Sequence, residues 1–227
     1  MLEFFRQRML KHLASVSLAA GCGMLDPSVA LADIPAPLVT ELLDDTVDSD
    51  WRDEDRGAVF DLLIKDPRAS VRCAIARAAV SADAPPNRNA QPLLRTLAAD
   101  GAWAVREAAA EALALWLQRA PVTSRVPTMC QWALAEAEPE RLAIARALAR
   151  PIDVPAADIA LGSLAGDSSP AVRCAAVNAI GQRWWCDASF AGEIAADALR
   201  DQDRRVRRAA KKLMRRLSGA SSRRIPP

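Results

Sequence analysis

The sequence repeats itself at a nearly constant interval, and this feature limits the possible folds more than any other. The peptide Val-Arg-Cys-Ala stands at 71–74 and again at 172–175, and Ala-Ile-Ala-Arg-Ala stands at 74–78 and again at 143–147. Aligning the copies places an arginine at five positions separated by 34, 35, 32 and 34 residues: Arg72, Arg106, Arg141, Arg173 and Arg207. This period is typical of repeat proteins, in which each unit buries its apolar face only against its neighbours.

Each arginine stands in a recurring pattern. An aspartate lies six residues before it in four of the units, and only the third unit departs, with Ala135 at that position. Counting from the residue before the arginine, apolar residues recur at positions 0, 3, 4, 7 and 8, as in 172–180. This spacing is one face of an α-helix. The third unit keeps most of the face but has Glu140 at its first position.

A second apolar segment with helical periodicity precedes each aspartate position. These segments are Val59–Ile64, Pro92–Leu97, Met129–Leu134, Ile159–Leu164 and Ile194–Leu199. Turn-forming residues separate the two segments of a unit, and in the fourth unit Ser169 is suited to cap the second helix while Pro170 opens it. Each unit is therefore predicted to be a helical hairpin.

The composition favours the same class. The chain has no tyrosine, 4 phenylalanines and 9 glycines, and alanine dominates its hydrophobic half. Helices favour alanine, leucine and arginine, whereas sheets favour β-branched and aromatic residues. We expect an all-α fold, an α-solenoid (superhelix) of stacked helical hairpins.

The repeating Asp-x-x-x-x-x-Arg units, with alanines following the arginine, resemble short bacterial HEAT repeats, also called phycobilisome-lyase HEAT-like repeats. The tetratricopeptide and ankyrin patterns fit less well, because one needs tyrosine and the other Thr-Pro-Leu-His, and the single histidine is His12. The resemblance implies a buried ladder in which each arginine bridges to an aspartate of its own or the next repeat. Arg141 is set apart, because its aspartate is missing. The ladder residues implied are Asp66, Arg72, Asp100, Arg106, Asp167, Arg173, Asp201 and Arg207.

The pattern divides the chain into three regions. Residues 1–56 are predicted to hold N-terminal capping helices, among them Pro37–Leu43, and an acidic linker. Residues 57–217 hold five repeats, with approximate bounds 57–82, 91–118, 128–150, 157–185 and 191–217. Residues 218–227 are predicted to be a basic disordered tail.

The formal net charge of +2 conceals an uneven distribution. Residues 200–227 contain eleven basic and two acidic residues, a net charge of +9, which leaves −7 for the rest of the chain. Three interpretations of this basic end remain open: a solvated outer face of the last repeat, a site for an acidic protein, or a site for nucleic acid or an anionic membrane. The candidate binding residues are Arg204, Arg205, Arg208, Lys211, Lys212, Arg215 and Arg216.

Tryptophan supplies a second candidate site. Trp184 and Trp185 are adjacent, so a helix cannot point both inward. Packing between repeats is one explanation for them, and an interface anchor is the other, because buried tryptophans contribute strongly to interface affinity. Trp116 and Trp132 are predicted to lie in the core.

The sequence offers little equipment for catalysis. It has one histidine, no phosphate-binding glycine loop, no cluster with metal-ligand spacing and no Gly-x-Ser-x-Gly, so we expect no metal, no cofactor and no catalytic residue. The expected function is a non-catalytic scaffold or adaptor for a macromolecule, with a protein as the expected partner. Nucleic-acid binding through the C-terminal basic helix, including an activity like that of the DNA alkylation-repair glycosylases, is the alternative. A role like that of a bilin-lyase subunit is a further one.

The cysteines and the N-terminus bear on location. Five widely spread cysteines without a Cys-x-x-Cys pair favour free thiols in a reducing cytoplasm. The segment Leu18–Cys22 leaves open an exported chain with a lipoprotein-like start at Cys22. No apolar run reaches the eighteen residues that a membrane span needs, so none is predicted.

Overall fold

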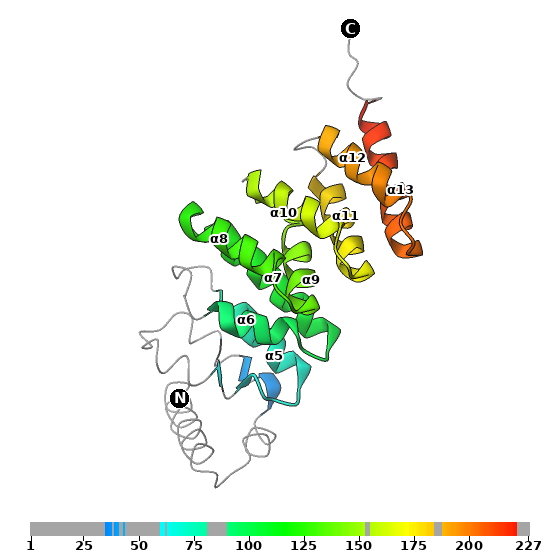
Figure 1. The fold of residues 1–227 in the computed structure, drawn as a ribbon. Helices are drawn as coiled ribbons and strands as arrows, with labels where there is room; N and C mark the ends of the chain where they lie inside the picture. Colours follow the sequence, from blue (N-terminus) through cyan, green and yellow to red (C-terminus); the bar gives the residue numbers. More distant parts are fainter. Residues whose placement is uncertain are drawn as a thin grey trace. The chain divides into compact units, whose positions relative to one another are not determined.

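The computed structural model describes residues 35–37, 39–40, 43, 60–61, 63–80, 90–152, 155–183 and 188–221, and these contain helices and turns but no strand. The all-α class predicted from the sequence is confirmed over this part of the chain. The labelled helices (Figure 1) are α5 (Ala69–Ala78), α6 (Ala90–Ala98), α7 (Trp103–Arg119), α8 (Val122–Ala133), α9 (Glu138–Ala147), α10 (Pro155–Ala165), α11 (Pro170–Arg183), α12 (Ala188–Ala198) and α13 (Arg204–Ser221).

The chain forms two compact units, Met1–Ala112 and Leu113–Pro227. In the first unit α5 packs against α6. The described residues within the predicted capping helix, 37, 39, 40 and 43, are helical, and both Val39 and Leu43 are buried. The apolar face of α5 is likewise buried, with Val71 and Ile75 fully covered.

In the second unit the hairpins stack in two layers. Helices α8, α10 and α12 follow one another in one layer, and α9, α11 and α13 follow one another in the other (Figure 1). Within each hairpin the two helices also pack together, as α8 on α9, α10 on α11 and α12 on α13. Within the layer of α8, α10 and α12, a small residue permits the close approach of two helices: Gly162 of α10 lies against the ring of Phe190 of α12.

The repeating apolar stripe forms the core. The residues at its first position, Val71, Val105, Val172 and Val206, are all fully buried, and Glu140 of the third repeat is half-buried. Trp116 and Trp132 are buried as predicted, whereas Trp103, the first residue of α7, is exposed. The stripe therefore buries one face of each second helix, as its periodicity requires.

The turn between the two helices of a hairpin uses the same bonds in successive repeats. The aspartate Oδ1 accepts a hydrogen bond from the backbone N–H two residues later, at 2.7 Å for Asp100, Asp167 and Asp201. Such bonds let aspartate hold a tight turn. Ser169 Oγ accepts a bond from the Ala171 N–H at 3.2 Å, so it caps α11, which begins at Pro170 as expected.

Some boundaries differ from those expected. Helix α13 continues to Ser221, four residues beyond the predicted end of the last repeat at 217, and Ser218 Oγ donates to the Met214 carbonyl on it. Helix α8 begins at Val122, earlier than the predicted third repeat. Residues 44–59, which include the acidic linker predicted within 1–56, lie outside the described residues, as do Cys22, Trp184, Trp185 and residues 222–227.

Candidate functional site

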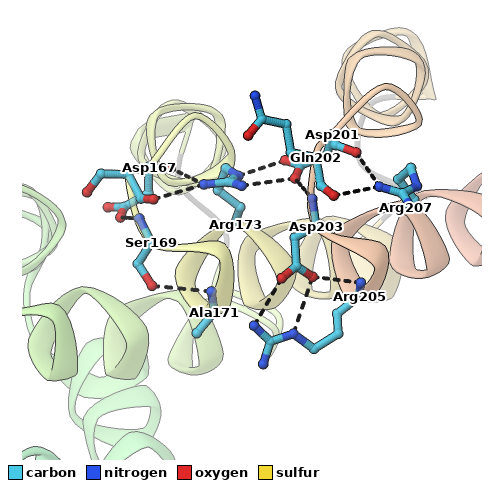
Figure 2. A network of polar contacts seen from close by, with 10 residues as sticks. Asp167, Ser169, Ala171, Arg173, Asp201, Gln202, Asp203, Arg205 and Arg207 are labelled. Atoms are coloured by element: carbon cyan, nitrogen blue, oxygen red, sulfur yellow. Dashed lines mark hydrogen bonds and ion pairs between the residues drawn. The ribbon is translucent and has the colours of Figure 1, made fainter.

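Arginine and aspartate side chains link successive hairpins through the same paired contact. Arg72 donates from Nε to Asp100 Oδ2 at 2.6 Å and from Nη2 to Oδ1 at 3.0 Å. The corresponding distances are 2.7 and 3.3 Å for Arg141 with Asp167. For Arg173 with Asp201, the pair drawn in Figure 2, they are 2.7 and 2.9 Å. We call each such contact a rung. Two parallel charge-assisted bonds make a rung both strong and specific in geometry.

The third nitrogen of each arginine serves its own repeat. Nη1 donates to the backbone carbonyl six residues earlier in all five units, at 2.7 Å for Arg106, 2.8 Å for Arg141 and 2.8 Å for Arg173. Arg72 and Arg207 make the same bond, to the carbonyls of Asp66 and Asp201. The arginine thus closes its own turn with one edge and reaches the next repeat with the other.

This division of roles corrects the expectation for Arg141. The sequence sets Arg141 apart because Ala135 replaces the aspartate of its own repeat. The arginine bonds only the backbone carbonyl of residue 135, however, and an alanine supplies that carbonyl. Its carboxylate partner is Asp167 of the following repeat. The alanine at position 135 affects Arg106 instead. In the repeat that follows Arg106, Ala135 stands where the other repeats have the aspartate. Among the described residues, Arg106 bonds only the carbonyls of Asp100 and Gly101.

The first aspartate of the series, Asp66, is paired within its own turn. Asp66 is 1% exposed, and Arg68, two residues later, donates to Oδ1 at 2.9 Å and to Oδ2 at 2.7 Å. The Arg68 backbone N–H adds a bond to Oδ1 at 2.8 Å. Arg68 therefore supplies the contact that an arginine of a preceding repeat would make.

The rungs alter the acidity of their carboxyl groups. Side-chain hydrogen bonds from Arg72 and Arg173 hold the pKa of Asp100 and of Asp201 below the ordinary 3.8, outweighing the opposing effect of burial. Burial acts most strongly on Asp167 and raises its pKa, but bonds from Arg141 and from the Ser169 N–H together prevail, so its pKa is also lowered. The carboxylates are thus held in their charged form in the folded chain.

The predicted basic residues of α13 fall into two groups. The first group has exposed side chains that make no hydrogen bond or ion pair with any described residue: Arg204, Arg208, Lys211, Lys212 and Arg215. Four of them are spaced by four, three and four residues, which aligns them along the helix opposite its buried face. We call Arg204, Arg208, Lys211 and Arg215 the basic stripe.

The second group has local partners. Arg205 pairs with Asp203 at 3.1 Å, and hydrogen bonds from its side chain and N–H lower the pKa of Asp203 to about 2. Arg216 donates from Nη1 to the Gly181 carbonyl at 2.6 Å, near the end of α11. A cation at this point satisfies a carbonyl that the helix leaves free. Arg216 therefore joins two repeats, and this structural contact explains the presence of an arginine there without the predicted binding role.

Sequence reasoning missed a related arginine. Arg183 is only 5% exposed and donates to the carbonyls of Arg150 and Ile152 at 3.1 and 3.0 Å, with Asp158 Oδ1 at 3.3 Å. It ties the end of α11 back to the preceding hairpin, as Arg216 ties α13 to α11. The signal was an arginine eleven residues after the first stripe position, where Trp116 and Leu217 stand in the second and fifth repeats.

No family model matches the chain, and no curated protein shows significant similarity to it. In the described part of the chain, no group of three His, Cys, Asp or Glu side chains could hold a metal ion. None of the described helices combines the length and apolarity of a membrane span.

Replacing Arg141 with alanine removes a rung and the local carbonyl bonds, whereas the same change at Arg207 in the same unit removes only the carbonyl bonds. We expect Arg141→Ala to lower the free energy of unfolding by about 3 kcal/mol, because Asp167 is left buried without its partner. Arg207→Ala, and likewise Arg106→Ala, should cost about 1 kcal/mol. Urea unfolding followed by circular dichroism measures both, and equal losses at Arg141 and Arg207 would contradict the rung.

The lowered carboxyl pKa values predict sensitivity to acid. Because the folded pKa of Asp201 lies below its unfolded value, the rung's contribution is fully present above about pH 4 and declines as the pH falls toward the folded pKa. Asp201→Asn should therefore weaken the loss of stability that occurs as the pH falls from about pH 4 toward the folded pKa of Asp201. Asp197→Asn is the control, because that side chain is 84% exposed and lies 4.0 Å from Arg200. The prediction fails if both variants keep the wild-type pH profile.

Proposed function

We propose that the chain is a non-catalytic scaffold of the HEAT type, an α-solenoid that uses its stacked hairpins to present a binding surface to a protein partner. The recurrence of one rung and one buried stripe in successive hairpins supports this proposal. Rungs of this kind favour a fixed stacking register, which suits a surface that must keep its shape. We place the protein in the cytosol, where the free thiols Cys73, Cys130 and Cys174 are stable.

The basic stripe indicates which kind of partner the chain binds. Its side chains are exposed and unpaired within the described chain, although Asp203 and Asp201 lie close by in sequence and are already bound to Arg205 and Arg173. Positive charges held on one face of a helix attract an acidic surface and increase the rate of association. We therefore propose that the partner is a protein with an acidic segment.

Nucleic acid is the second candidate, because the same stripe could neutralise phosphates. The two candidates differ in their response to salt and to probe chemistry. A phosphate-binding surface loses affinity steeply as salt increases, since each neutralised phosphate releases counterions. An acidic polypeptide that also makes apolar and hydrogen-bonded contacts loses less.

Charge reversal on the stripe tests the proposal. We expect the variant Lys211→Glu with Arg215→Glu to lose binding of a fluorescein-labelled oligo-aspartate peptide by at least about tenfold, as measured by fluorescence anisotropy at low salt. The control is Lys65→Glu with Arg77→Glu, which changes the net charge equally at two exposed positions on another part of the chain. Equal losses in the two variants would show that only net charge matters and would contradict a site on α13.

A further inference from the structure

The last arginine of the series differs from the arginines that form rungs. Nη1 of Arg207 bonds the carbonyls of Asp201 and Gln202 at 2.7 Å each, as in the other repeats (Figure 2). Its Nε and Nη2 make no hydrogen bond or ion pair with a described residue, and its side chain is partly exposed. These are the two nitrogens with which Arg173 binds Asp201. The edge of Arg207 that binds a carboxylate elsewhere is thus held in place without one.

The neighbouring positions of α13 show that this face corresponds to a covered one in the preceding repeat. Thirty-four residues earlier, the counterparts of Arg208, Lys211 and Arg215 are Cys174, Val177 and Gly181. Val177 and Gly181 are buried, and a Cβ on Gly181 would lie 3.8 Å from Leu213 of α13. The face of α11 that receives α13 is therefore apolar and small, whereas the same face of α13 is basic.

An apolar side chain remains exposed on this basic face. Met214 is 40% exposed, whereas its counterpart Ile180 is 3% exposed. Met214 follows Arg207 by seven residues, so both lie on the same side of the helix, two turns apart. Helix α13 thus presents an oriented guanidinium and a flexible apolar side chain beside the basic stripe.

A second copy of the chain does not supply the missing carboxylate by continuing the ladder. The first carboxylate, Asp66, is buried and has both oxygens bound by Arg68. The two ends of the series are therefore unequal: the first aspartate is satisfied locally, and the last arginine is open. The occupant of the open end must bring its own carboxylate.

We propose that the outer face of α13 docks an acidic segment of another protein, with one aspartate or glutamate carboxylate bound by Nε and Nη2 of Arg207. This inference rests on the proposed function and adds to it the anchoring residue and the class of group bound. The same two nitrogens bind a carboxylate at 2.6 to 3.3 Å in three rungs of this chain. The basic stripe supplies the surrounding positive potential, and Met214 supplies an apolar contact for the polypeptide.

The test compares two substitutions that keep the charge. Arg207→Lys removes the paired nitrogens and Arg208→Lys, next to it on the stripe, removes a guanidinium that holds no fixed bond. With oligo-aspartate as probe and the full chain, we expect Arg207→Lys to weaken binding by about tenfold and Arg208→Lys by less than about twofold. Thermal unfolding of both variants checks that α13 is intact.

The outcomes separate this inference from the proposed function. Equal affinities for Arg207→Lys, Arg208→Lys and wild type, together with loss in the stripe variant, would overturn the anchor and leave the scaffold proposal standing. No binding of oligo-aspartate by the wild type, or tighter binding of oligo-dT of equal length, would overturn both in favour of no site or of nucleic acid. If Arg207→Lys unfolds, a second experiment on the wild-type chain replaces it. Phenylglyoxal modifies arginine side chains, and mass spectrometry measures whether oligo-aspartate protects Arg207 more than Arg208. Protection of Arg207 supports the anchor, and no protection overturns it.

Discussion

The rung between an arginine and the aspartate of the next repeat is the interaction on which the described structure depends. Alanine-rich helix faces pack closely but provide few features that fix one helix against another. A guanidinium bound through two nitrogens to a carboxylate accepts only one relative placement. With side-chain exposures between 8% and 17%, the rungs also lie where an unpaired charge is costly. Their main contribution is therefore the register of the hairpins.

The same interaction explains why the ends of the series differ in chemistry. Every rung needs an arginine from one repeat and an aspartate from the next. In the series from Asp66 to Arg207, the first aspartate and the last arginine have no such partner among the described residues, and Arg106 lacks one because of Ala135. Arg68 resolves the first by binding Asp66 within a single turn. Nothing in the described chain resolves the last, and Arg207 remains open among other cations. The proposed binding function therefore rests on the open edge of Arg207 and not on a separate motif.

Periodicity predicted the hairpins, the buried stripe and the capped start of α11, because these depend on residues close together in the sequence. Partner choice across repeats was not predictable. The sequence shows that Arg141 lacks an aspartate six residues earlier, but not that its side chain reaches forward to Asp167. Arg216 reads as one more surface charge until α11 is placed beside it. Both contacts depend on the separation of neighbouring helices, which a single sequence does not contain.

Hydrogen exchange of the arginine Nε–H groups, measured by NMR on the ¹⁵N-labelled chain near neutral pH, tests the rungs most directly. The Nε–H groups of Arg72, Arg141 and Arg173 should exchange with water at least about tenfold more slowly than those of Arg106 and Arg207, because only the first three are bonded to a carboxylate. Exchange of Arg141 as fast as that of Arg207 would contradict the rung and with it the explanation of the open end.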